Sequence, residues 1–125
     1  MTQPSSSPTQ SIGQKGEALA ASYLQAQGWA ILATNWRCTR GELDIIAQHG
    51  AMLVFVEVRT RRAENTEAAF ASITPTKRKR LMAAIYDYLA QQDLGDTDWR
   101  VDAIAVALRR HAAPLIDHAE DALGW

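Results

Sequence analysis

The segment from residue 41 to residue 59 constrains the fold of this chain most strongly. It reads GELDIIAQHGAMLVFVEVR, two strand-like runs on either side of a tight turn at His49-Gly50. The second run is apolar on both faces for most of its length, and such a strand is covered by other elements above and below. The segment therefore predicts a hairpin whose second arm lies at the centre of a sheet.

Acidic residues occupy both arms of this hairpin. Glu42 and Asp44 share one face of the first arm, and Glu57 and Arg59 share one face of the second, because strand side chains alternate with period two. The predicted turn places Asp44 opposite Phe55 and diagonal to Glu57, and a slip of two residues would place the acids directly opposite on the same face. Facing carboxylates repel, so the pattern predicts a divalent cation between them.

The rest of the chain predicts a single domain, residues 12–125, behind a disordered tail. Residues 1–11 are mostly Ser, Pro, Gln and Thr and carry no core pattern. Thr74-Pro75 is a helix-start signal, and Gly28 is a helix-stop signal. The remaining patterns predict helices at 12–27 and 75–91, strands at 29–37, 99–108 and 115–116, and a loop at 61–73 with a short helical turn near 68–70.

Composition excludes several classes of site. Cys38 is the only cysteine, so an internal disulfide and a cysteine-based zinc site are both excluded. The three histidines show no paired metal-ligand spacing. No apolar run reaches the length of a membrane span, and the N-terminus lacks an apolar secretory core. The expected location is therefore a reducing bacterial cytoplasm, with no membrane partner.

Charge is divided unevenly along the chain. Residues 37–80 hold nine Lys/Arg and five Asp/Glu, a balance of +4, whereas residues 81–125 hold three and eight, a balance of −5. Lys77 to Arg80 places four cations in the first turns of a helix, where they oppose the helix dipole but can bind phosphate. Arg59, Arg61 and Arg62 extend this basic patch. The pattern favours a phosphate-rich partner, and a solvated basic face is the alternative.

The acids and the basic patch suit phosphodiester hydrolysis. Mg²⁺ or Mn²⁺ held by carboxylates can activate water and neutralise phosphate charge, and hard cations prefer such oxygen ligands. Asp44 and Glu57 would supply the carboxylates and Arg59 the cation near the phosphate, with Glu17 and Glu42 as further candidates. The alternative for each acid alone is a surface residue or a buried salt bridge with Arg59.

Three segments resemble a known family. They are Gly16-Glu17-Ala18, RGELDIIA at residues 40–47 and VFVEVRTR at residues 54–61, with weaker echoes at Lys77 and Asp102. Over residues 13–122 the chain resembles the YraN-like family of uncharacterised bacterial proteins. Through that family it is similar to the PD-(D/E)XK nuclease superfamily, including archaeal Holliday-junction resolvases.

The resemblance implies an α/β fold of the restriction-endonuclease-like type, with a central mixed sheet that contains an antiparallel hairpin and is flanked by helices. It implies that Asp44 and Glu57 are metal ligands and that Glu17 completes the metal site. The metal would be Mg²⁺ or Mn²⁺, and the partner would be nucleic acid, most simply DNA. The residues expected to contact nucleic acid are Arg40, Arg61, Arg62, Lys77, Arg78, Lys79 and Arg80.

One motif position departs from the superfamily. The motif lysine, which orients or deprotonates the attacking water, falls on Arg59, and arginine keeps the charge but cannot act as a base. Three functions therefore stay open: a metal-dependent DNA nuclease, a catalytically impaired nucleic-acid-binding module, and a protein-interaction domain whose acids form salt bridges. Resolvase-like nucleases often act as dimers, so the resemblance also implies a homodimer.

Overall fold

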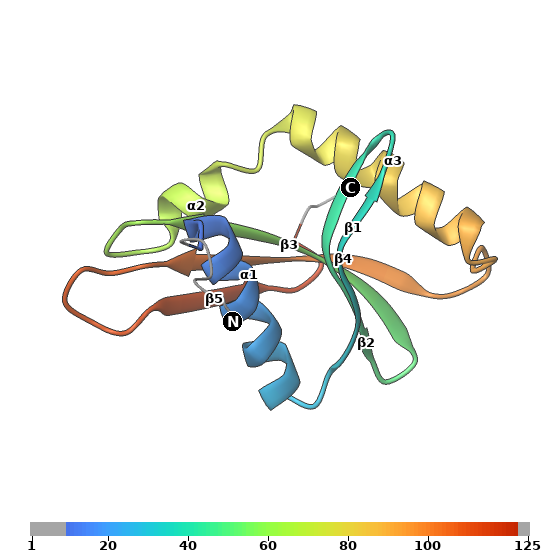
Figure 1. The fold of residues 1–125 in the computed structure, drawn as a ribbon. Helices are drawn as coiled ribbons and strands as arrows, with labels where there is room; N and C mark the ends of the chain where they lie inside the picture. Colours follow the sequence, from blue (N-terminus) through green and yellow to red (C-terminus); the bar gives the residue numbers. More distant parts are fainter. Residues whose placement is uncertain (1–9, 123–125) are drawn as a thin grey trace, which may run out of the picture.

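The computed structural model describes residues 10–122 (Figure 1). Its elements follow the predicted order, and helices and strands occur where the sequence patterns place them. They are α1 (Ile12–Ala26), β1 (Ala30–Cys38), β2 (Gly41–His49), β3 (Met52–Arg61), α2 (Glu67–Ala71), α3 (Pro75–Gln91), β4 (Trp99–Ala107) and β5 (Leu115–Ala119). No helix among these residues is long and apolar enough to cross a membrane.

The five strands form one mixed sheet in the order β1-β2-β3-β4-β5. Three neighbouring pairs are antiparallel, while β3 and β4 are parallel and are joined by a crossover that contains α2 and α3. The strand β3 is therefore central, as its apolar faces predict. This confirms the predicted α/β class with helices flanking a mixed sheet, an architecture compatible with the restriction-endonuclease-like fold.

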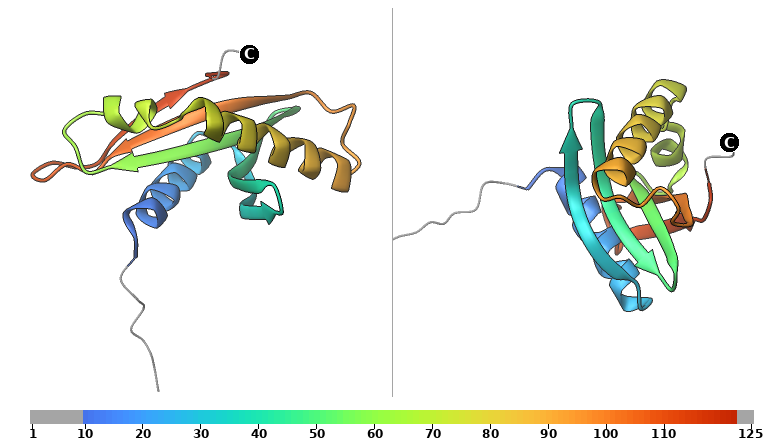
Figure 2. Two further views of the ribbon diagram at one scale, coloured as in Figure 1. Left: turned by 90° about the horizontal axis from the view of Figure 1, so that it is seen from above. Right: turned by 90° about the vertical axis from the view of Figure 1, so that its right-hand side faces the viewer.

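The two long helices cover opposite faces of the sheet (Figure 2). One core joins Leu81 and Ile85 of α3 to Phe55 of β3. The other joins Leu24 of α1 to Val56 of β3, the next residue along the same strand. Both cores consist of fully or almost fully buried side chains, so β3 is fixed by apolar contacts on both sides.

The register of the central hairpin differs from the predicted one by two residues. His49 pairs with Met52, so the turn residues are Gly50 and Ala51 rather than His49 and Gly50. Gly50 has φ +61°, and hairpin turns that need positive φ at the first central position favour glycine there. The predicted pairing of Asp44 with Phe55 is therefore wrong, but the shift is even, so every side chain keeps its predicted face.

Side-chain caps fix the starts of α1 and α3. The Thr74 hydroxyl accepts a hydrogen bond from the Lys77 N–H, as the Thr-Pro signal predicts. Ser11, assigned to the tail from sequence, instead forms a capping box with Gln14. Residues 1–9 of the predicted tail lie outside the described residues.

A buried carboxylate fastens β5 and the turn after it to the sheet. Asp102 is fully buried, and its oxygens accept hydrogen bonds from Arg100 at 2.9 and 3.2 Å and from the Asp121 N–H at 2.9 Å. His118 Nε2 lies 2.8 Å from the same carboxylate, and its Nδ1 lies 3.3 Å from the Tyr23 hydroxyl of α1. This network joins α1, β4 and β5 on the α1 side of the sheet.

Candidate active site

The sheet divides at the point where the predicted acids lie. The ladder between β2 and β3 ends at the pair Ile45–Val56. Beyond it, β2 continues to pair with β1 alone, and β3 continues to pair with β4 alone. Asp44 and Glu57 are the first residues past the last pair, one on each branch. The two acids therefore lie at the mouth of an opening between the branches.

Asp44 joins the two branches through its side chain. Its Oδ2 accepts a hydrogen bond from the Val58 N–H at 2.8 Å, bridging the strands where their backbone ladder has ended. The residue is only 9% exposed. Because a buried backbone donor needs a partner, this bond fixes the carboxyl in the opening.

The carboxyl groups of Asp44 and Glu57 form a close pair. Burial raises the pKa of Asp44 to about 8, and the neighbouring Glu57 carboxylate and a hydrogen bond to it add to this rise. Burial also raises the pKa of Glu57, against the opposing effects of that hydrogen bond and of the Arg59 and Lys77 cations. Two carboxyls this close do not readily ionise together, and the raised pKa of Asp44 favours its protonated form below about pH 8.

Glu17 approaches this pair from α1. The helix comes very close to β3 at the preceding residue, where a Cβ on Gly16 would lie 1.7 Å from the Thr60 Oγ1. Burial raises the pKa of Glu17 and the nearby Asp44 carboxylate raises it further, whereas a hydrogen bond with Asn35 lowers it. Glycine at position 16 therefore allows the helix to bring a third acid towards the opening.

Asn35, which the sequence reading missed, supports Glu17 from β1. Its backbone has φ +52° in the middle of the strand, beside the opening. Asparagine is one of the few residues that adopt this left-handed conformation readily. The one sequence sign of a special role at this position is the asparagine itself, because asparagine is unfavourable within a strand.

Two cations stand beside the carboxyl pair. Arg59 Nη1 lies 3.9 Å from Glu57 Oε2, and its Nε donates a 2.8 Å hydrogen bond to the Ser72 Oγ at the end of α2. Burial lowers the pKa of Lys77, in the first turn of α3, and the neighbouring Arg59 and Arg61 lower it further. Arg59 and Arg61 therefore lie close enough to Lys77 to act on its charge, and the Glu57 carboxylate opposes their effect on its pKa.

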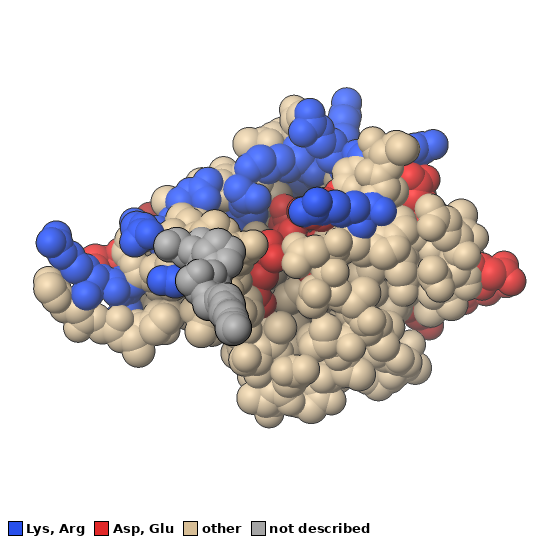
Figure 3. Space-filling view, in the orientation of Figure 1, with Lys and Arg blue, Asp and Glu red and all other residues tan. Residues whose placement is uncertain are grey.

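The predicted basic residues do not all gather here. A pocket of about 670 Å³ contains Asp44 and Glu57 together with the cations Arg40, Arg59, Lys77 and Arg80. Arg37 also lines it and forms a 2.5 Å ion pair with Glu42. Arg61, Arg62, Arg78 and Lys79 do not line this pocket. In the space-filling view, Lys and Arg side chains form a band over the upper part of the molecule, with acidic atoms visible beneath it (Figure 3).

The donor set suits a hard cation completed by other ligands. Within residues 10–122, no three His, Cys, Asp or Glu side chains are close enough to form a ready-made metal site. Glu17 therefore does not join Asp44 and Glu57 in one compact cage. Two buried carboxyls whose pKa values are raised nevertheless fit Mg²⁺, which commonly uses one or two carboxylates, several waters and substrate phosphate oxygens.

Comparison with known proteins places the chain in a family. Residues 16–106 match the family described as "Uncharacterised protein family UPF0102". A UPF0102 protein of Geotalea uraniireducens is 45% identical over 112 residues, covering 90% of this chain and 88% of that protein. A UPF0102 protein of Chloroflexus aurantiacus is 43% identical over 118 residues, covering 94% and 96%. The matched stretch includes Glu17, Asp44, Glu57 and Arg59, and the chain belongs to the UPF0102, or YraN-like, family.

Proposed function

We propose that this protein is a Mg²⁺- or Mn²⁺-dependent nuclease that hydrolyses phosphodiester bonds in DNA. The observation that carries the proposal is the pair of carboxyls at the division of the sheet, the buried Asp44 and the partly buried Glu57, whose pKa values are both raised. Such a pair is costly unless a cation compensates it, and perturbed acids in a pocket mark functional sites more often than structural ones.

The carboxylates of Asp44 and Glu57 would hold the cation, and the Val58 N–H orients Asp44 for this role. When bound, Mg²⁺ or Mn²⁺ would neutralise phosphate charge and lower the pKa of a bound water. Glu17, which forms a hydrogen bond with Asn35 of β1, would accept a hydrogen bond from a water of the hydrated cation.

Arg59 and Lys77 would bind the phosphate. Charge grows on the phosphate oxygens during hydrolysis, and cations held in position beside them stabilise it. The hydrogen bond that Arg59 donates to the Ser72 Oγ fixes the arginine side chain, so its charge is already in position before the phosphate binds. Lys77 lines the same pocket, and it would supply the lysine side chain that the motif position at Arg59 lacks.

A second candidate is a module that binds DNA without cutting it. Arg59 favours it, because this side chain lies between Ser72 and Glu57 and cannot accept a proton from water. In that case the pocket would retain phosphate binding, and the carboxyl pair would be a remnant of lost chemistry.

The decisive experiment compares the wild-type protein with an Asp44→Asn, Glu57→Gln double variant. Both are incubated with branched, duplex and single-stranded DNA in Mg²⁺, in Mn²⁺ and in EDTA. We expect cleavage by the wild type alone and only with metal. Equal behaviour of the two proteins on every substrate would exclude the nuclease.

An Arg59→Lys variant separates the two candidates. If the wild type binds DNA without cutting and the variant cuts, the site is a dormant nuclease. If both bind DNA and neither cuts, the binding module is the correct assignment.

A further inference from the structure

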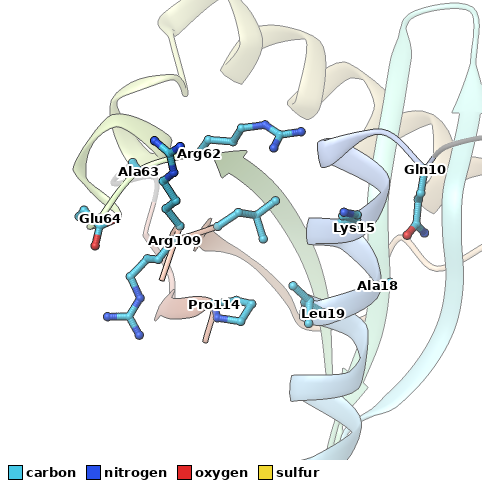
Figure 4. Close-up of a pocket in the computed structure, with 11 residues that line it drawn as sticks. Gln10, Lys15, Ala18, Leu19, Arg62, Ala63, Glu64, Arg109 and Pro114 are labelled. Atoms are coloured by element: carbon cyan, nitrogen blue, oxygen red, sulfur yellow. The ribbon is translucent and has the colours of Figure 1, made fainter. Parts of the chain in front are cut away.

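A second basic groove lies between α1 and the ends of β3 and β4 (Figure 4). It has a volume of about 930 Å³, and we call it the α1–β4 groove. Its cations are Lys15 of α1, Arg62 directly after β3, and Arg109 and Arg110 after β4. Only one acid, Glu64, lines it. The groove is therefore strongly positive and lies outside the pocket that holds Asp44 and Glu57.

The charges of this groove are available to a ligand. None of the ion pairs found among the described residues involves Lys15, Arg62 or Arg110. Lys15, Arg62 and Arg110 are also exposed. Arg109 is held in place, because its Nε donates a 2.9 Å hydrogen bond to the Ala113 carbonyl. Unpaired cations gathered on two walls suit a chain of phosphates.

Two elements connect the groove with the carboxyl pocket. Lys15 lies two residues before Glu17 on α1, and Arg62 follows the strand that carries Glu57. At about 3.3 Å per strand residue, Arg62 lies roughly 16 Å beyond Glu57 along β3. That span corresponds to at most about five nucleotides, taking the roughly 3.4 Å per nucleotide of a fully stacked strand. In Figure 3 the blue band likewise extends from the α3 side of the molecule towards the β4–β5 end.

Part of the groove is apolar. Leu19 of α1 and Pro114, directly before β5, lie on opposite sides of it (Figure 4), and Leu108 after β4 also lines it. Duplex DNA turns its phosphates outwards and stacks its bases inside, so its base faces cannot pack against this apolar lining. An unpaired strand exposes base faces, which pack on apolar side chains and on arginine planes. The combination favours an unpaired strand over a duplex.

We propose that the α1–β4 groove holds an unpaired segment of the DNA substrate, about five nucleotides from the bond that is cut. This rests on the proposed nuclease function and adds a substrate class to it, duplex DNA with a single-stranded extension. Lys15, Arg109 and Arg110 then act as phosphate contacts that neither the motif nor the basic run 77–80 predicts.

The test measures binding without cleavage. Fluorescence anisotropy in EDTA compares a labelled duplex with the same duplex carrying an unpaired tail of about ten nucleotides, roughly twice the expected span. A Lys15→Gln, Arg110→Gln variant removes two exposed charges of the groove. A Lys79→Gln, Arg80→Gln variant removes the same charge from α3 as a matched control.

We expect the wild type to bind the tailed duplex more tightly than the plain one, and the groove variant to lose this preference while its plain-duplex affinity is unchanged. Each phosphate contact to an unpaired strand contributes about 0.7 to the slope of log K against log salt. Losing two such contacts should therefore make this slope shallower by about 1.4, for the tailed duplex only. The α3 variant should bind both ligands more weakly than the wild type, and to the same extent.

Equal affinity of the wild type for the two ligands, or an unchanged preference in the groove variant, overturns this inference. Metal-dependent cleavage could still be found in that case, so the proposed function would survive. A preference that depends on Lys15 and Arg110 in a protein that never cuts would instead support the groove and exclude the nuclease.

Discussion

Replacing Asp44 by asparagine should stabilise the metal-free protein at neutral pH. Burial and the adjacent Glu57 hold the pKa of Asp44 at about 8, far above its ordinary value of 3.8. An acid whose pKa is raised by folding stabilises the fold fully below pH 3.8, and this contribution is lost as the pH rises through 8. Asparagine removes the ionisation but keeps an oxygen for the Val58 N–H and a donor for Glu57.

The size of the effect follows from the pKa. Each pH unit between the unfolded and folded values costs the wild type about 1.4 kcal/mol. At pH 7, roughly three units above the pKa of Asp44 in the unfolded chain, the ionisation of Asp44 can lower the free energy of unfolding by at most about 4 kcal/mol. Because Glu57 shares the proton, we expect about 2–4 kcal/mol, or a rise in Tm of roughly 10 °C for a domain of this size.

Urea unfolding in EDTA at several pH values measures this difference. The advantage of Asp44→Asn should be almost absent near pH 4 and should grow steadily to pH 7.5. Glu42→Gln is the matched control on the same strand, because Glu42 forms a surface ion pair with Arg37. Such pairs contribute little, so this variant should stay within about 0.5 kcal/mol of the wild type.

Added metal should reverse the order of stability. A ligand at about 1,000 times its Kd stabilises the protein that binds it by about 4.1 kcal/mol, which exceeds the expected advantage of Asp44→Asn. Mn²⁺ should therefore stabilise the wild type and leave Asp44→Asn unchanged. If Asp44→Asn is no more stable than the wild type in EDTA at pH 7.5, the two carboxyls are not a strained, cation-deficient pair, and our reasoning about the site is wrong.

Two further predictions concern residues around the pocket. Lys77→Met should lower the single-turnover rate of DNA cleavage by roughly 10²–10³-fold, because the substitution removes a cation at the phosphate. Lys79→Met, on the exposed side of α3, is the control and should change this rate little. Gly16→Ala should lower the free energy of unfolding by about 1–3 kcal/mol in urea titrations, because the new methyl would meet Thr60, and Gly13→Ala, with its nearest contact at 3.9 Å, is the control that should not destabilise.

The faces of the central strands could be predicted, but their register could not. Alternation fixes which side chains share a face, and β3 must be central because both its faces are apolar. The register depends on which residues form the turn. His49-Gly50 and Gly50-Ala51 are both acceptable by composition, and the preference of Gly50 for positive φ at the first position decides between them.

Contacts between residues that are far apart in the sequence cannot be predicted from a single sequence. Asn35 supports Glu17 only because β1 and α1 meet at the opening, and Lys15 lies near Arg110 only because α1 packs beside the end of β4. The same holds for Asp102, whose partners include His118, 16 residues away, and Asp121, 19 residues away. Local spacing cannot reveal such pairs, because they arise from tertiary packing.

The sheet contains two buried aspartates, and their surroundings show which one is structural. Asp102 is compensated within the protein, by the Arg100 guanidinium, by His118 and by the Asp121 N–H. Asp44 has one backbone donor, and its nearest charged neighbour is another acid. A carboxylate that folding leaves beside a like charge costs stability, and such a cost is typical of functional sites. Asp44 therefore lacks a compensating positive charge of the kind that Arg100 gives Asp102, and a cation bound with the substrate would supply that charge.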